Sequence, residues 1–222
     1  MKIIQLVLAS SLLAAVAFGA DEAIERCDRA AEVLDEVMGT PEQAIPNDLI
    51  AKAECVGIIP GVKKVGLGFG GKYGKGVLVC RTASGWSGPS TVRIEGGSVG
   101  FQIGGSSTDV VLLVMNKKGA EKLLESKFTL GADAAVAGGP VGRSAQAQTD
   151  AQMHAEILSY SRSRGAFAGV SLEGATLRPA EDDNKKLYGK KVEPKEILSG
   201  AIAAPAGTAA LAKALDKHGP RK

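Results

Sequence analysis

Residues 55–93 read CVGIIPGVKKVGLGFGGKYGKGVLVCRTASGWSGPSTVR. Glycine interrupts the short apolar runs of this segment every few residues, a pattern typical of hairpins of short strands rather than of a helix. We expect strands at about 55–59, 64–70, 75–81 and 90–95, with turns near Pro60-Gly61 and near Gly74. Further strands are expected at about 98–104 and 109–115, so this part of the chain should form a glycine-rich, largely antiparallel sheet.

The same segment separates charge. It contains no acidic residue, although the whole protein has 27 basic and 24 acidic side chains. The aromatic residues Phe69, Tyr73 and Trp86 lie between the cations. A basic surface with interleaved aromatics indicates an anionic partner, and the alternative is a glycine-rich sheet whose lysines are only solvated. The cations are Lys63, Lys64, Lys72, Lys75, Arg81 and Arg93.

The first 20 residues have the pattern of a secretory signal peptide. A basic start precedes an apolar run from Ile3 to Phe18, and small residues between Ala15 and Ala20 fit a cleavage site. The run is short for a membrane span, although an uncleaved N-terminal anchor is the alternative. We therefore expect an exported protein, periplasmic or secreted, whose mature part is one domain.

The segment 21–44 is predicted to contain an amphipathic helix from Asp21 to Met38. Its apolar residues recur at steps of three and four, its polar face is mostly acidic, and Gly39 supplies a stop. Such a face does not bind an anionic membrane, so we expect the helix to pack on the domain or to contact the basic segment.

The rest of the chain alternates short helices and extended segments, and residues 201–222 are predicted to be a mobile tail rich in alanine, proline and glycine. Helices are expected at 47–54, from Asn116 to 125, at 182–188 and 194–198, and as an isolated helical tail at 209–217. Extended segments are expected at 127–142, 155–162, 165–173 and 175–178.

Motifs for nucleotide binding are incomplete. Gly66, Gly68 and Gly71 satisfy G-x-G-x-x-G, and a P-loop pattern begins at the same place. However, no helix is predicted to follow, and Tyr73 stands where a P-loop has Ser or Thr. We do not expect a nucleotide here.

Catalytic and metal-binding patterns are weak. A hydrolase would have to bring Asp109, His154 or Glu173 together in one pocket, and no pair of acids has the spacing that acid–base catalysis needs. The chain has two histidines and no Cys-x-x-Cys pair, which argues against a metal site. We therefore predict no enzymatic activity, cofactor or metal, and no nucleic-acid partner for an exported chain of nearly neutral charge.

Several segments together resemble the SYLF domain, a lipid-binding and actin-associated module. They run in order through about residues 45–200, and their combination is more specific than any one of them. The matching segments are Ile45-Pro46, the glycine-rich 65–81, 85–90 (GWSGPS), 100–104 (GFQIG) with Thr108-Asp109, 137–143 (AGGPVGR), Tyr160-Ser161, 165–174 (GAFAGVSLEG), 187–189 (LYG) and 195–198 (KEIL).

This resemblance implies a single compact α+β domain over residues 45–200, in which helices pack on the antiparallel or barrel-like sheet. It also implies binding of anionic lipids such as phosphoinositides, without catalysis. The chain departs from eukaryotic members because residues 21–38 are acidic where those members have a basic helix, and because an export signal would separate it from cytosolic actin. In these respects it looks like exported bacterial members.

We therefore expect the six cations named above to meet anionic phospholipid headgroups, with Tyr73 or Trp86 at the membrane interface. The alternative is an envelope adaptor that presents the same basic face to an acidic protein.

Cys27, Cys55 and Cys80 allow one disulfide or none. Strand order alone leaves the pairing open, because a three-stranded meander would place Cys55 and Cys80 near opposite ends unless the first strand pairs elsewhere. Cys27 lies on the apolar stripe of a helix, where a buried free thiol is common. The resemblance to exported members that have both later cysteines favours a Cys55–Cys80 bridge.

Overall fold

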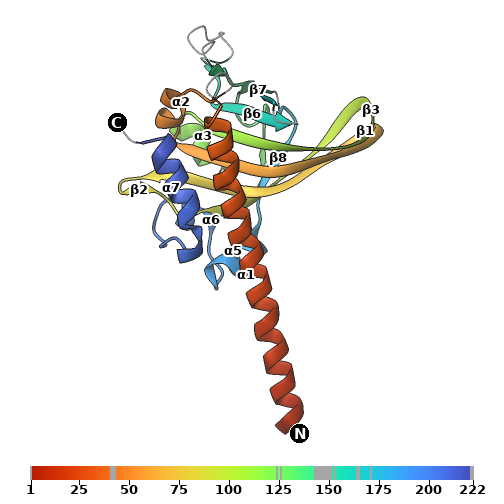
Figure 1. Cartoon of the computed structure of the whole chain (residues 1–222), viewed down its shortest axis with the longest axis vertical. Helices are drawn as coiled ribbons and strands as arrows, with labels where there is room; N and C mark the ends of the chain where they lie inside the picture. Colours follow the sequence, from red (N-terminus) through yellow and green to blue (C-terminus); the bar gives the residue numbers. More distant parts are fainter. Residues whose placement is uncertain are drawn as a thin grey trace.

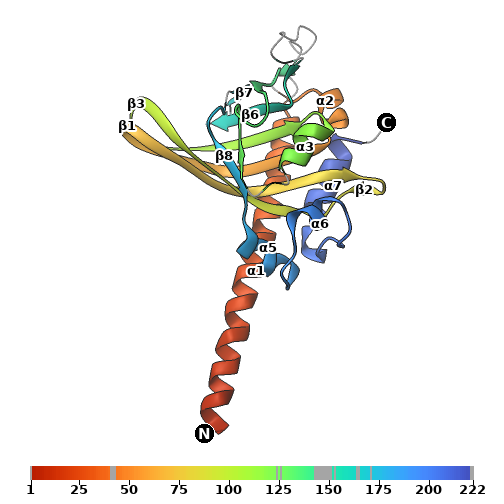
Figure 2. The same cartoon turned by 180° about the vertical axis from the view of Figure 1, so that it is seen from behind.

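The computed structural model describes residues 2–40, 44–123, 125, 127–142, 152, 154–163, 166–170 and 172–220, and of residues 2–19, 65–69, 98–105, 166 and 167 it describes the backbone alone. A curled sheet lies at the centre of the domain, with helices packed on it (Figure 1). The reverse view shows the short helices α3 (Lys117–Leu123) and α6 (Pro194–Leu198) on the other side of the sheet (Figure 2).

One long antiparallel ribbon forms most of the sheet. Strand β1 (Cys55–Thr82) pairs with β3 (Ser90–Val114) from Cys55 opposite Val114 to Leu78 opposite Ser90, and the short β2 (Gly85–Trp86) closes the hairpin. The register shifts between Gly66 and Gly68. There the ribbon folds back on itself at a tip that points away from the helices (Figure 1). The six short strands expected here are therefore two long strands.

Glycine in β1 permits close approach of its two halves rather than turns. A Cβ on Gly76 would lie 2.3 Å from the carbonyl oxygen of Ile58, and one on Gly74 would lie 2.8 Å from Cγ2 of Val62. The turn expected near Gly74 is therefore wrong, because this glycine lies within the strand. Pro60-Gly61 is also not a turn but an irregularity in the pairing, where Gly61 has a φ of 60°.

Folding of the ribbon brings two cysteines together. Cys55 and Cys80 form a disulfide with their Cα atoms 4.0 Å apart, and the backbone N–H of Arg81 donates to the carbonyl of Glu54 beside it. This is the pairing that the resemblance favoured. Cys27 is free and buried, and burial raises the pKa of its thiol to about 12, so this thiol stays protonated at neutral pH.

The remaining strands extend the sheet from β3. Strand β6 (Ile157–Ser163) pairs with residues 109–114 of β3, and β8 (Thr176–Pro179) pairs with residues 92–95. Strands β4 (Phe128–Thr129) and β7 (Ala166–Gly169) add antiparallel pairs, and β5 (Val136–Gly138) runs parallel to β6. The prediction of an α+β domain with a largely antiparallel, barrel-like sheet is confirmed.

Helix α1 (Lys2–Met38) is longer than the predicted 21–38 and is continuous through the predicted cleavage region. Its N-terminal half extends beyond the rest of the domain in both views (Figures 1 and 2). From residue 20 on, where side chains are described, no helix is long and apolar enough to cross a membrane.

The shorter helices agree with their capping signals. The side chain of Asn116 accepts a hydrogen bond of 2.8 Å from Gly119 N at the start of α3, as a helix cap does. Helix α5 (Glu181–Tyr188) ends at Gly189, whose φ is 70°. Helix α2 (Asn47–Lys52) and α6 lie where they were expected, and α6 begins with a capping box between Glu193 and Glu196.

Apolar residues form two cores, one on each face of the sheet. Alternate residues of β1 serve the two faces, as the period of a strand requires. One core packs Val77 and Val79 against Leu34 of α1 and Ile50 of α2. The other core contains Ile59, Leu78, Ile94, Phe128 and Leu177.

The C-terminal segment is not the mobile tail that its composition predicted. Helix α7 (Ala209–His218) packs on α1, and Leu211 and Leu215 are at most 1% exposed. Asp35 of α1 accepts hydrogen bonds from Lys217 and His218 at the end of α7. The buried side chains of α7 are Leu211, Ala214 and Leu215, which recur at helical spacing. The alanine-rich composition of the segment made this apolar stripe hard to recognise in the sequence.

Candidate functional site

The folded end of the β1–β3 ribbon carries three lysines and a tyrosine. Lys63 and Lys64 are exposed opposite Ser107 and Ser106, and Lys72 is half-buried opposite Gly96. Burial lowers the pKa of Lys72, and the charge of Lys64 lowers it further, so the two ammonium groups lie close enough to repel each other. None of the three lysines forms an ion pair with a described residue. Among the described residues, Tyr73 is the large hydrophobic side chain that is exposed, to 47%.

We call Lys63, Lys64, Lys72 and Tyr73 the ribbon surface. Neighbouring residues of a strand point to opposite faces, so Lys63 and Lys64 are on different faces of the ribbon. Lys63 and Tyr73 border a cleft of about 310 Å³ on the side of α1. Lys64 and Lys72 are on the other face. The ribbon surface therefore has residues on both faces of the ribbon and is not one flat patch.

The acidic helix α1 borders the same cleft. Glu22, Glu25, Arg26 and Arg29 line it from the helix side. On its opposite side the helix buries an apolar stripe that includes Cys27 and Leu34, both fully buried. Helix α1 thus does both things expected of it, since it packs on the domain and contacts the basic segment.

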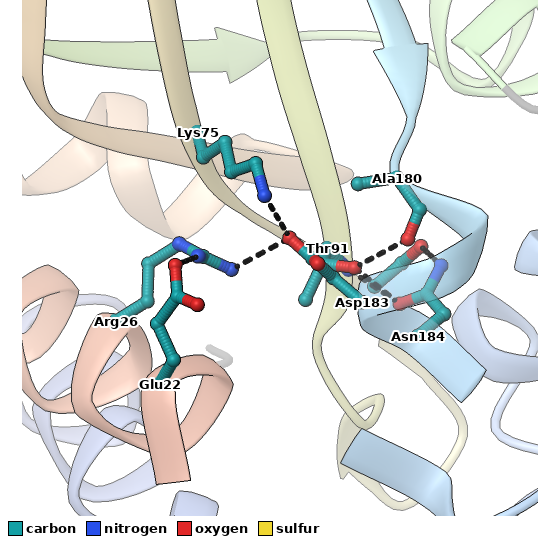
Figure 3. A network of polar contacts seen from close by, with 8 residues as sticks. Glu22, Arg26, Lys75, Thr91, Ala180, Asp183 and Asn184 are labelled. Carbon is teal, nitrogen blue, oxygen red and sulfur yellow. Dashed lines mark hydrogen bonds and ion pairs between the residues drawn. The ribbon is translucent and has the colours of Figure 1, made fainter. Parts of the chain in front are cut away.

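Lys75 is half-buried and held by an ion pair within the protein. Its ammonium group donates to Oδ2 of Asp183 at 2.9 Å, and Arg26 donates to the same oxygen at 3.2 Å (Figure 3). Arg26 also donates to Glu22 at 2.9 Å. Asp183 is 7% exposed, so the ion pairs are largely shielded from solvent. Lys75 therefore joins β1 to α1 and α5 and is not free to bind a ligand.

Next to this network, Asn184 fixes α5 to β3. Its Oδ1 accepts from the backbone N–H of Thr91 at 2.7 Å and from the Thr91 hydroxyl at 2.8 Å, and its Nδ2 donates to Ser90 (Figure 3). The sequence analysis did not identify Asp183 or Asn184 as important. An acidic run at the start of a predicted helix is typical of a first turn that is exposed to solvent. The signal that was present is the polar pair Ser90-Thr91 at a buried strand end.

Arg81 and Trp86 lie at the hairpin end of the ribbon, far from the tip. The guanidinium of Arg81 donates to the carbonyls of Ala53, Ile50 and Gly219, and it stacks 4.0 Å above the Trp86 ring. Trp86 is partly buried against a core. These two residues therefore hold α2 and the end of α7 on the sheet, and they do not join the other predicted site residues.

Arg93 lies in a third place, on the stretch of β3 that pairs with β8. Its Nε is 2.6 Å from a carboxylate oxygen of Glu95. The predicted eight-residue surface therefore separates into the ribbon surface, an internal ion pair, a clamp at the hairpin end and a cleft beside β8.

The polar residues considered for catalysis are not brought into one pocket by the described structure. Asp109 accepts hydrogen bonds from Gly61 N and from two nitrogens of Arg162, at 2.9–3.0 Å. His154 and Glu173 are exposed on other segments. Gly66, Gly68 and Gly71 lie inside β1, so no helix follows this G-x-G-x-x-G pattern. Within the described residues, no group of three or more His, Cys, Asp or Glu is placed to hold a metal.

Comparison with known proteins gives the family. The family model Ysc84, described as Las17-binding protein actin regulator, matches residues 95–218. The chain belongs to the Ysc84 family. This confirms the relationship that the SYLF-like segments indicated.

Curated relatives are longer proteins. An SH3 domain-containing protein of Schizosaccharomyces pombe is 36% identical over 200 residues, which cover 86% of this chain and 46% of the relative. LAS seventeen-binding protein 3 of Saccharomyces cerevisiae is 36% identical over 188 residues, 83% of this chain and 40% of the relative. The human SH3 domain-containing YSC84-like protein 1 is 35% identical over 178 residues, which cover 79% of this chain and 52% of the relative. The chain thus spans about half the length of these relatives or less.

Proposed function

We propose that this chain is a non-enzymatic binding module whose ribbon surface holds anionic phospholipid headgroups. One observation carries the proposal: Lys63, Lys64 and Lys72 make no ion pair with a described residue, on the part of the ribbon that lies between the cleft beside α1 and the tip that points away from the helices (Figure 1). The exposed ring of Tyr73 beside them suits a membrane–water interface, where tyrosine places an apolar ring and a polar hydroxyl.

The strength of this interaction follows from the number of free cations. Each lysine near an anionic membrane contributes about 1 kcal/mol, so three contribute about 3 kcal/mol before Tyr73 is added. Six free cations would have bound about twice as strongly, but Lys75, Arg81 and Arg93 have internal partners. We therefore expect weak, reversible binding that is lost at high salt, since salt screens exposed charges.

Co-sedimentation with vesicles tests the proposal. The triple variant Lys63→Glu, Lys64→Glu, Lys72→Glu should lose binding to vesicles that contain phosphatidylserine. A control with the same change of charge is Lys185→Glu, Lys186→Glu, Lys190→Glu, because these lysines are exposed on and after α5. The control should bind like the wild type at low salt. Equal binding of the wild type and the ribbon variant would show that the ribbon surface is not the lipid site.

A protein partner is the second candidate, and the names of the relatives favour it. The yeast relative is named for binding LAS seventeen, and the family description names Las17 binding and actin regulation. By this route the ribbon surface would bind an acidic segment of a protein. Replacing Tyr73 with a photo-crosslinking phenylalanine analogue would identify such a partner directly. Crosslinks to one protein that vanish in the Lys63, Lys64, Lys72 variant would favour the adaptor over the lipid-binding module.

We also propose that residues 1–20 direct export, on the sequence pattern given above. Sequencing of the N-terminus of the protein isolated from its native cell tests this. A start near Asp21 is expected, and an intact Met1 in a membrane fraction would indicate the uncleaved anchor.

A further inference from the structure

Four cations stand in one row across four strands. In the sheet register Lys75 of β1 is opposite Arg93 of β3, and Arg93 is opposite Arg178 of β8. Lys127 directly precedes Phe128, whose partner in β8 is Leu177, so the same register places Lys127 against Arg178. Directly opposed residues of antiparallel strands point to the same face. All four line a single cleft of about 620 Å³, next to the start of α5.

This cationic row is unfavourable by itself, since like charges directly opposite each other on a sheet destabilise it. Its compensation is incomplete. Asp183 holds Lys75, and the carboxylate of Glu95 lies between the two arginines, 2.6 Å from Arg93 Nε and 3.9 Å from Arg178 Nε. Lys127 is exposed and makes no ion pair with a described residue.

The arginines also carry buried donors that are not satisfied. The Nε atoms of Arg93 and Arg178 are buried and have no hydrogen-bond partner in the described part of the chain, because the contact with Glu95 lacks hydrogen-bond geometry. Buried donors are almost always paired, so Glu95 alone leaves the hydrogen bonding of the two guanidinium groups incomplete. The side chains of both arginines are 38% exposed, and both line the cleft.

We propose that three members of the cationic row, Arg93, Arg178 and Lys127, form a binding site for a phosphate-bearing ligand. Guanidinium groups bind phosphate oxygens in a planar, two-pronged geometry, and a lysine adds a point charge. The cleft has the volume of small-molecule sites, about 300–1,000 Å³. Glu181, Asp182 and Asp183 border the cleft on the side of α5, where Asp183 already pairs with Lys75. This site is separate from the ribbon surface and shares no residue with it.

Binding of inorganic pyrophosphate to the full chain tests the site. Isothermal titration calorimetry at constant ionic strength should show binding by the wild type. The variant Arg93→Gln, Arg178→Gln should bind about tenfold more weakly or not at all, as expected when two charge-assisted contacts are lost. Lys127→Gln, which changes an exposed side chain, should weaken binding severalfold and serves if the double variant does not fold. The matched control Lys185→Gln, Lys186→Gln should bind like the wild type.

Thermal unfolding separates a binding role from a structural one. If the row exists to bind phosphate, the double variant should be as stable as the wild type without ligand, and pyrophosphate should raise the Tm of the wild type alone. Vesicles of phosphatidylcholine with a phosphatidylinositol phosphate identify the source of the phosphate. Loss of vesicle binding in the double variant assigns it to a lipid headgroup, and retained vesicle binding assigns it to a soluble phosphate compound.

Two results would overturn the site. One is the absence of binding to both pyrophosphate and the phosphoinositide vesicles at millimolar ligand. The other is equal pyrophosphate affinity in the wild type and in the row variants. The ribbon variant Lys63→Glu, Lys64→Glu, Lys72→Glu keeps the two proposals apart, because it should still bind pyrophosphate even where it no longer sediments with phosphatidylserine vesicles.

Discussion

The two ends of the β1–β3 ribbon come from one acid-free stretch of sequence but have different surroundings. At the hairpin end, Arg81 and Trp86 stack on each other, and Arg81 binds three backbone carbonyls. At the folded tip, Lys63 and Lys64 are exposed and make no ion pair with a described residue. A cation next to an aromatic thus serves the fold at one end and remains available to a partner at the other.

The difference is caused by the fold in the ribbon. Because β1 doubles back between Gly66 and Gly68, its hairpin end returns to the body of the domain, where α2 and α7 pack on it. The tip is the part of the ribbon farthest from these helices (Figure 2). The sequence shows where charged side chains are, but it does not show whether such a side chain pairs within the chain or binds another molecule. The path of the backbone determines which of the two is the case.

The largest expected effect comes from a glycine where the halves of β1 touch. Gly76→Ala places a methyl group 2.3 Å from the Ile58 carbonyl oxygen, a backbone atom that cannot move easily. We expect a loss of about 3 kcal/mol or more in the free energy of unfolding in urea, or no folded protein, because overpacking of this kind displaces backbone. Gly71→Ala, near the tip, meets its nearest atom at 3.9 Å and is the control. Equal stabilities of the two variants would mean that the halves of β1 are not in contact.

A smaller loss is expected from the clamp at the hairpin end. Arg81→Ala removes the side-chain donor to the carbonyls of Ala53 and Gly219 and one of the two donors to the carbonyl of Ile50, and it should lower the free energy of unfolding by about 2 kcal/mol. Lys64→Ala at the tip removes an exposed side chain and should change it by less than about 0.5 kcal/mol. Chemical denaturation of both variants measures the contrast. A stable Arg81→Ala protein that no longer binds vesicles would return Arg81 to the binding surface.

The smallest effect concerns acid pH at the α1–α7 contact. Hydrogen bonds from Lys217 and His218 lower the pKa of Asp35 below its ordinary value of 3.8. The stability that this carboxylate adds is therefore complete above pH 3.8 and is lost as the pH falls through the lowered folded value. Asp35→Asn should be less stable than the wild type near neutral pH, and the difference should shrink in strong acid. A difference independent of pH would exclude this carboxylate as the titrating group.

Local elements were predictable from the sequence where local chemistry sets them. The helix at 182–188, its stop at Gly189 and the cap at Asn116 follow from capping and backbone preferences that act within a few residues. The segments that resemble the SYLF domain predicted the fold class. By contrast, Gly74 was interpreted as a turn residue, because a sequence does not show which distant backbone will lie against a glycine.

The site was predictable in part. Of the eight predicted residues, Lys64 and Lys72 lie near each other on one face of the ribbon, and Lys63 and Tyr73 lie near each other on the other face. Lys75 was assigned to the same surface, but its partner Asp183 lies 108 positions away in the chain. The cationic row could not be predicted, because Lys127 and Arg178 join Arg93 only through the pairing of β4 and β8 with β3. In both cases the sequence does not show which distant segments of the chain lie next to each other in the fold.

Tryptophan fluorescence compares the two ends in a single measurement. The chain has one tryptophan, Trp86, at the hairpin end. In the wild type its emission should not change when phosphatidylserine vesicles are added. In the variant Tyr73→Trp, Trp86→Phe, the tryptophan at the tip should shift its emission to the blue and lose the shift at high salt, because the ring enters the membrane interface. A shift of Trp86 emission in the wild type, or an unchanged spectrum of the double variant in the presence of vesicles that bind it, would contradict the assignment of the tip as the membrane-binding end.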